Sequence, residues 1–218
     1  AGAVSPGRAS VPSVCGIAGG TGAGVSGGRR HAAISSTTAA LSTSRARDRL
    51  AGMATREALL AEFDHEMAAT RRVLRCIRDD RLGWKPHERS RSLGALAAHL
   101  AHIPTWALQI VDRERVDLDE PLAIDTEPAS RTALIEAFDG DVGRVRRALD
   151  RSDAELHAPW TLAREGYEMF RMPRAAAIRA FVLGHVVHHR GQLTVYLRLI
   201  DVPVPPLYGP TADSGRQP

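Results

Sequence analysis

The sequence predicts an all-α protein: a four-helix bundle with a disordered N-terminal leader and an extended, proline-rich C-terminal tail. Two observations support this fold class. Apolar residues recur at helical spacing in four segments of the chain, and no segment alternates apolar and polar residues for long enough to form a sheet. Four amphipathic helices joined by short to moderate connections can bury their apolar faces against one another.

The leader comprises residues 1–52, which are rich in Gly, Ala, Ser, Thr and Arg and nearly devoid of large apolar side chains. Such a segment buries too little surface to offset its ordering entropy, so we predict disorder. Its composition suits an organelle transit peptide, and Arg29-Arg30 suggests a twin-arginine export signal, although a poor hydrophobic region follows. We favour a third origin, an upstream read-through with Met53 as the true start, because helical pattern begins directly after Met53.

The first predicted helix spans residues 55–80 and begins at Thr55, a suitable N-cap. Gly83 and Pro86 lie in the turn that follows it. Cys76 follows the apolar pattern only loosely, and we interpret it as a packed, inert thiol. The apolar stripe of this helix consists of Leu59, Leu60, Phe63, Met67, Leu74 and Ile77.

The second predicted helix begins near Ser92, a good N-cap, and carries His99 on its apolar face. Pro104 is expected to kink or break it, and residues 112–129, which are acidic and contain two prolines, are expected to form a loop. The other residues of the apolar face are Leu93, Leu96, Leu100 and Ile103.

The third predicted helix spans residues 130–150, and residues 152–172 are expected to form an ordered connector packed on the bundle because they show no clear periodicity. The helical spacing is carried by Leu134, Phe138, Val142, Val145 and Leu149.

The fourth predicted helix spans residues 174–201, with Pro173 placed as its first helical residue. Four prolines after Asp201 forbid regular helix, so the tail is expected to be extended and to pack back on the domain; residues 215–218 are expected to be a disordered end. The apolar stripe of the fourth helix contains Ile178, Val182, Leu193, Tyr196 and Ile200, together with two histidines.

These two histidines, His185 and His189, are four residues apart and therefore project from the same helix face. A polar pair on an apolar face is unfavourable unless a partner satisfies it, and a divalent metal ion would do so. His99 supplies a third inward-facing imidazole from another helix. Three histidines without a carboxylate resemble a catalytic zinc-type site, which leaves a position for water or substrate and lowers the pKa of a bound water or thiol. Zinc, nickel, iron, cobalt and manganese all suit such ligands.

Several polar residues lie close to this histidine pair in the sequence. His188 is expected to be exposed or at an interface, with a supporting role at the site as the alternative. Gln192 is placed to line the mouth of a pocket, and Arg190 is expected to pair with acidic residues on the surface. Tyr208 in the tail either donates a hydrogen bond at the site or packs on the domain.

Composition excludes several classes of protein. Six arginines against one aspartate in residues 1–52 account for the formal net charge of +4, and the rest of the chain is close to neutral, which argues against a nucleic-acid surface. Aromatic residues make up only 5% of the chain, too few for base-stacking platforms. Two unpaired cysteines do not indicate a disulfide framework, and no apolar run is long enough for a transmembrane helix, so we expect a soluble, intracellular protein.

Several motifs together resemble the DinB-like superfamily, also called the YfiT-like metalloenzymes. They are SLGALAAHL in the second helix, HVVHHRGQLTVYLRL in the fourth, the tail VPVPPLYGP, and the turn GWKPHERS before the second helix. The resemblance covers residues 53–214, the expected domain, and is strongest in the last fifty residues. It implies a bundle that holds one divalent transition metal through a histidine of the second helix and the HxxxH pair of the fourth, which correspond here to His99, His185 and His189.

The resemblance also sets functional expectations. Family members are usually dimers, and some are S-transferases or isomerases that use low-molecular-weight thiols, whereas others hydrolyse. We therefore expect a bacterial, cytoplasmic homodimer and a metal-dependent enzyme, a thiol-dependent S-transferase or a hydrolase, acting on a small electrophilic molecule. A thiol co-substrate is expected, and nucleic-acid and membrane partners are not. The alternative is a non-catalytic metal-binding module that serves a stress response or binds a ligand. No catalytic residue beyond the metal ligands can be named.

Overall fold

The computed structural model describes residues 54–120 and 127–214, which all fall within one compact unit. The predictions for the leader, for Met53 and for residues 215–218 lie outside the described residues.

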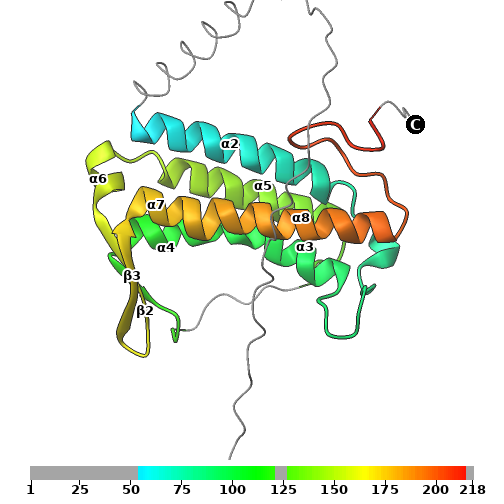
Figure 1. Ribbon diagram of the computed structural model, residues 1–218, viewed down its shortest axis with the longest axis horizontal. Coiled ribbons are helices and arrows are strands. Elements are labelled where there is room, and N and C mark those ends of the chain that lie inside the picture. The colour runs from blue at the N-terminus through cyan, green and yellow to red at the C-terminus, as the bar shows by residue number, and fades with distance from the viewer. Residues whose placement is uncertain (1–53, 121–126, 215–218) are drawn as a thin grey trace, which may run out of the picture. The chain divides into compact units, whose positions relative to one another are not determined.

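Four helices form the main framework: α2 (Thr55–Leu74), α3 (Leu93–His102), α5 (Arg131–Ala148) and α8 (Gly184–Leu199). Helix α2 contacts α5 and α8, and α3 contacts the same two helices (Figure 1). Each of the four helical segments predicted from apolar periodicity is therefore present, with revised bounds. The shorter helices are α4 (Trp106–Asp112), α6 (Asp153–His157) and α7 (Arg174–Ile178).

Helix α2 is shorter than predicted and begins without the predicted cap. The side chain of Thr55 does not cap the helix; instead the carboxylate of Asp153 accepts hydrogen bonds from the backbone N–H groups of Thr55, at 3.1 Å, and Arg56, at 2.9 Å. The predicted end at residue 80 was wrong, because the chain leaves the helix after Leu74. The guanidinium of Arg131 then donates to backbone carbonyls just beyond this end, so a residue distant in the sequence satisfies the terminus.

The predicted serine cap of α3 is confirmed, since Ser92 Oγ accepts a hydrogen bond from the backbone N–H of Ala95 at 3.0 Å. Pro104 lies in a short 3₁₀ turn, Ile103–Thr105, that separates α3 from α4, as expected of a proline that interrupts a helix. Ser130 caps α5 in the same way as Ser92 caps α3.

The fourth predicted helix is interrupted near its start. Pro173 is not its first helical residue but the residue before α7, and a π-helical turn, η3 (Arg179–Leu183), separates α7 from α8. A π turn inserts one residue into the helical repeat and rotates everything that follows about the helix axis. The faces of α8 are therefore offset from those of α7, which matters for the histidines described below.

A small sheet contradicts the all-α prediction. Strands β1 (Arg115–Asp117), β2 (Pro159–Arg164) and β3 (Tyr167–Pro173) lie in the order β1-β2-β3, with β1 parallel to β2 and β2 antiparallel to β3. The predicted loop thus contains β1, and the predicted connector contains α6 and the β2–β3 hairpin. The strands are short, and β1 pairs with a strand more than forty residues away, so neither alternation nor local turn chemistry was sufficient to reveal them.

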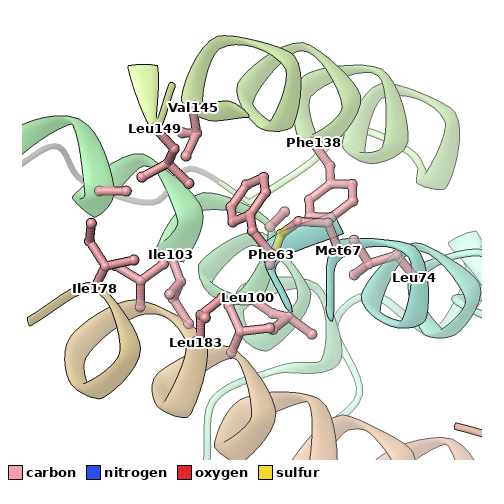
Figure 2. Packing of buried hydrophobic residues seen from close by; sticks show 14 of the residues in the cluster. Phe63, Met67, Leu74, Leu100, Ile103, Phe138, Val145, Leu149, Ile178 and Leu183 are labelled. Carbon is pink, nitrogen blue, oxygen red and sulfur yellow. The ribbon is translucent and has the colours of Figure 1, made fainter. Parts of the chain in front are cut away.

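The hydrophobic core lies between the four main helices (Figure 2). Side chains from all of them meet there, and most are fully buried. This packing holds α3 beside α8 and thereby brings the segment that carries His99 against the segment that carries the HxxxH pair. The core residues labelled in Figure 2 are Phe63, Met67, Leu74, Leu100, Ile103, Phe138, Val145, Leu149, Ile178 and Leu183.

Candidate metal centre

The three predicted histidines lie together between α3 and α8. Each offers one ring nitrogen, and these three atoms lie within 4.8 Å of one another. The Nε2 atoms of His185 and His189 are 2.8 Å apart, and the ring centroid of His99 is 5.2 Å from that of His185 and 4.6 Å from that of His189. The structure therefore brings all three residues to one point from two separate segments of the chain.

The position of the HxxxH pair on α8 differs from the predicted one. The buried stripe of this helix runs through Val186, Arg190, Leu193 and Leu197. It shares Leu193 with the predicted stripe but otherwise lies one residue later, so the histidines lie at its edge. Both are half-buried rather than fully buried. This offset leaves the imidazoles held by α3 on one side and accessible on the other.

Burial shifts both histidines of α8 towards the neutral form. Desolvation lowers the pKa of His189 to about 4; a hydrogen bond to Gln192 opposes the shift, and the neighbouring His185 adds to it. Desolvation also lowers the pKa of His185, with further contributions from His99 and His188. At neutral pH both rings are therefore uncharged, which is the protonation state that a metal ligand requires.

Gln192 connects the site to a fourth histidine. Its Oε1 lies 2.8 Å from Nδ1 of His189, and its Nε2 lies 3.1 Å from Nε2 of His188. The rings of His188 and His189 are in edge-on contact, with centroids 4.8 Å apart. His188 is exposed, as predicted, but it is also in contact with the polar network around the three imidazoles.

A cavity of about 500 Å³ opens against this cluster. His189 and Gln192 form part of its wall, as predicted for Gln192. Tyr196 forms another part, and its ring packs edge-on against Trp84 at a centroid distance of 5.7 Å, which holds the wall in place. Apolar periodicity predicted only a packing role for Tyr196, although its position one helical turn after Gln192 places it on the same face as that residue. The remaining lining residues are Ser90, Arg91, Leu96 and Val195.

Arg190 is not a surface residue, contrary to the prediction. Only 1% of the residue is exposed, and its guanidinium donates to the carboxylate and the backbone carbonyl of Glu66 at 2.5 and 2.9 Å. Nη1 also donates to Thr70 Oγ1 at 3.1 Å. The hydroxyl of Tyr208 donates to the same Glu66 carboxylate at 2.7 Å and contacts Arg190, so it serves this cluster and not the imidazoles.

The remaining thiol of the described chain fits the inert role predicted for it. Cys76 is partly buried, and this burial raises its pKa, with Arg131 opposing the shift. The thiol is therefore protonated at neutral pH and a poor nucleophile.

These features define a class of protein: a predominantly helical domain in which two adjacent helices present three convergent histidines beside an open cavity. Residues 52–217 match the model of the DinB family, and the chain belongs to this family. None of the helices in residues 54–120 and 127–214 combines the length and the hydropathy needed to cross a bilayer.

Similar proteins agree with the family and the fold. The uncharacterized protein YrdA of Bacillus subtilis is 25% identical over 158 residues, which cover 71% of this chain and 88% of YrdA. A DinB-like protein from Bacillus cereus has a similar structure, with a TM-score of 0.54, 22% identity, and coverage of 70% of this chain and 97% of the other. The DinB-like protein YjoA from Bacillus subtilis gives a TM-score of 0.53 and 18% identity, with coverage of 69% and 97%. At these identities the two structures support the fold alone.

Proposed function

We propose that this chain is a DinB-type four-helix bundle that binds one divalent transition metal ion through His99, His185 and His189. We further propose that it is a metal-dependent enzyme of the thiol-dependent S-transferase or hydrolase type, acting on a small electrophilic molecule. The observation that carries the proposal is the convergence of three imidazole nitrogens within 4.8 Å of one another.

The donor set fits such an ion. Zinc bound to imidazole at about 2.0–2.1 Å in tetrahedral geometry places its ligand nitrogens roughly 3.3–3.4 Å apart, so the 2.8 Å between Nε2 of His185 and Nε2 of His189 needs only a small adjustment. The cluster contains imidazoles alone, which suits zinc, nickel, iron, cobalt or manganese better than magnesium or calcium. The lowered pKa values of the α8 pair keep both lone pairs available at neutral pH.

The surroundings favour a catalytic site over a structural one. Structural zinc sites are closed by four protein ligands, whereas three ligands beside a cavity leave room for an external molecule. When bound, the ion supplies Lewis acidity and lowers the pKa of a water or thiol in contact with it. In the cavity, Gln192 and Tyr196 provide hydrogen-bonding groups that orient a substrate, and Leu96 and Val195 provide an apolar wall for its body.

Metal analysis of the purified full-length chain tests the first part of this proposal. We expect about one zinc, nickel, iron, cobalt or manganese ion per chain, and loss of most of that metal in His185→Ala. The variant His102→Ala is the matched control and should retain the metal, because His102 lies on α3 outside the cluster. Equal metal content in His185→Ala and the unmodified protein would rule out the proposed ligand set.

Turnover tests the second part. The metal-loaded protein is mixed with a low-molecular-weight thiol and an electrophile such as 1-chloro-2,4-dinitrobenzene, and with activated esters in a separate assay. Metal-dependent product formation that disappears in His185→Ala is expected. Stoichiometric metal binding without turnover of any tested thiol, electrophile or ester would favour the non-catalytic metal-binding alternative.

A further inference from the structure

We infer that Gln192 is a positioning residue that sets the tautomer of His189, and that His188 in turn sets the orientation of the Gln192 amide. The inference concerns how the proposed metal site is prepared and therefore rests on the proposed function for its purpose. What it predicts, however, is which ring nitrogen of His189 carries the proton, and this can be measured in the metal-free protein.

The Gln192 amide determines which nitrogen of His189 carries the proton. Its oxygen can only accept hydrogen bonds and its NH₂ group can only donate them. Because Oε1 lies 2.8 Å from His189 Nδ1, that nitrogen must carry the ring proton of a neutral imidazole. The other ring nitrogen, Nε2, then has a free lone pair, and this is the atom that faces His185.

His185 is held by a hydrogen bond of its own. A hydrogen bond links its ring to the backbone of Phe181 and acts to raise its pKa, so the ring is the donor. Because Nε2 of His185 faces His189, Nδ1 is the nitrogen left for this contact. Phe181 belongs to the π-helical turn η3, which directly precedes α8. Both α8 imidazoles are therefore held from behind at Nδ1, with their Nε2 atoms directed at one point, where the 2.8 Å hydrogen bond between them requires one proton as long as no metal ion is bound.

The neighbouring His188 holds the Gln192 amide in one of its two orientations. An amide can rotate by half a turn and exchange its oxygen and NH₂ group, and the opposite orientation would place a donor on His189 Nδ1 and force the proton onto Nε2. The NH₂ group of Gln192 lies 3.1 Å from Nε2 of His188, which is exposed and free to present an acceptor there. His188 thus stabilises the orientation that leaves Nε2 of His189 available. His188, His189 and Gln192, which form this arrangement, lie close together on α8 in the pattern HHxxQ of residues 188–192.

The test uses the full-length, metal-free chain labelled with ¹⁵N-histidine at pH 7.5. Long-range ¹H–¹⁵N spectra report which ring nitrogen carries the proton. In the unmodified protein we expect His189 to be protonated on Nδ1. In Gln192→Leu we expect a mixed or Nε2-protonated state. In Gln192→Glu, which keeps an acceptor at the same reach, the Nδ1-protonated state should be restored. Gln109→Leu, on the exposed face of α4, is the matched control and should leave the His189 signals unchanged.

A second measurement connects the tautomer to metal binding. Removing an outer hydrogen-bond partner of a metal-ligating histidine lowers metal affinity about 10–100-fold, so zinc affinity should fall by at least tenfold in Gln192→Leu and by much less in Gln192→Glu. A His189 ring protonated on Nε2 in the unmodified protein would overturn the inference, as would an unchanged tautomer in folded Gln192→Leu. If the tautomers follow the expectation but the unmodified protein binds no metal, the proposed function fails and the positioning role of Gln192 stands.

Discussion

Arg190 on α8 and Glu66 on α2 form an ion pair inside the protein, with Arg190 Nη2 2.5 Å from Glu66 Oε2. The side chains of these residues are only 1% and 12% exposed. The pair ties α8, which carries two of the three histidines, to its neighbour α2, and Arg190 directly follows His189 in the sequence. The position of this ion pair therefore determines how α8 presents its imidazoles to α3.

The first prediction concerns this pair. Replacing Arg190 by Met leaves the buried Glu66 carboxylate without its charged partner and with only the Tyr208 hydroxyl as donor. Breaking a buried pair in this way typically lowers the free energy of unfolding by about 3–5 kcal/mol. Chemical denaturation followed by circular dichroism measures the change. The control is Arg78→Met, which removes an exposed pair with Asp80 and should change stability by less than about 1 kcal/mol. If the free energy of unfolding fell by a similar amount in the two variants, the buried pair would contribute no more to stability than the exposed one.

The second prediction concerns stabilisation by metal. An ion that binds only the folded protein raises its stability by about 2.7 kcal/mol when free metal is present at 100 times the dissociation constant. Zinc titration of the metal-free chain should therefore raise the thermal midpoint, and His99→Ala should abolish the increase. His102→Ala is a suitable control, because His102 lies on α3 but approaches Asp141 at 3.4 Å and is not part of the cluster. An increase that persists unchanged in His99→Ala would point to a different binding site.

The third prediction concerns pH. In the metal-free protein the pKa of His189 is lowered from its usual value near 6.5 to about 4, and that of His185 is also lowered. Between pH 6.5 and about 4 the unfolded chain therefore binds more protons at these positions than the folded chain, so stability falls as the pH is lowered through this window. Denaturant midpoints measured at pH 7.5, 6.5 and 5.5 should decrease in that order.

The variant His189→Gln identifies the source of this pH dependence. It removes one of the two shifted groups while retaining a polar side chain, so its stability should depend less steeply on pH between 6.5 and 5.5. An identical slope in the variant and the unmodified protein would assign the effect to other titrating groups.

The fourth prediction concerns the start of α2. Asp153 accepts two backbone hydrogen bonds from the first residues of this helix, and these bonds lower its pKa. Asp153→Ala should therefore lower the thermal midpoint, and it should do so more than Asp150→Ala, which removes only an exposed contact with Arg56. The difference in thermal midpoint between the unmodified protein and Asp153→Ala should decrease as the pH falls below the ordinary aspartate pKa near 3.8, because protonation of Asp153 removes the charged acceptor.

Part of the fold was predictable because helical periodicity is a local property. The apolar residues of α2, α3, α5 and α8 recur within each segment, and Ser92 caps α3 through a residue only three positions away. The sheet was missed because β1 pairs with β2 across more than forty residues, and short strands carry little alternation of their own. The start of α2 at Thr55 was predicted correctly, but its cap was misassigned, because the acceptor Asp153 lies far along the chain.

The sequence by itself determined that two histidines share a helix face at a spacing of four residues and that a third lies on the apolar face of another helix. Only the tertiary structure decided that α3 and α8 lie side by side, that Arg190 occupies the buried stripe, and that the histidines lie at its open edge. The physical reason is that spacing fixes the direction of side chains around one helix axis, whereas packing, the π turn before α8 and the buried partner Glu66 fix how that axis is rotated against its neighbours.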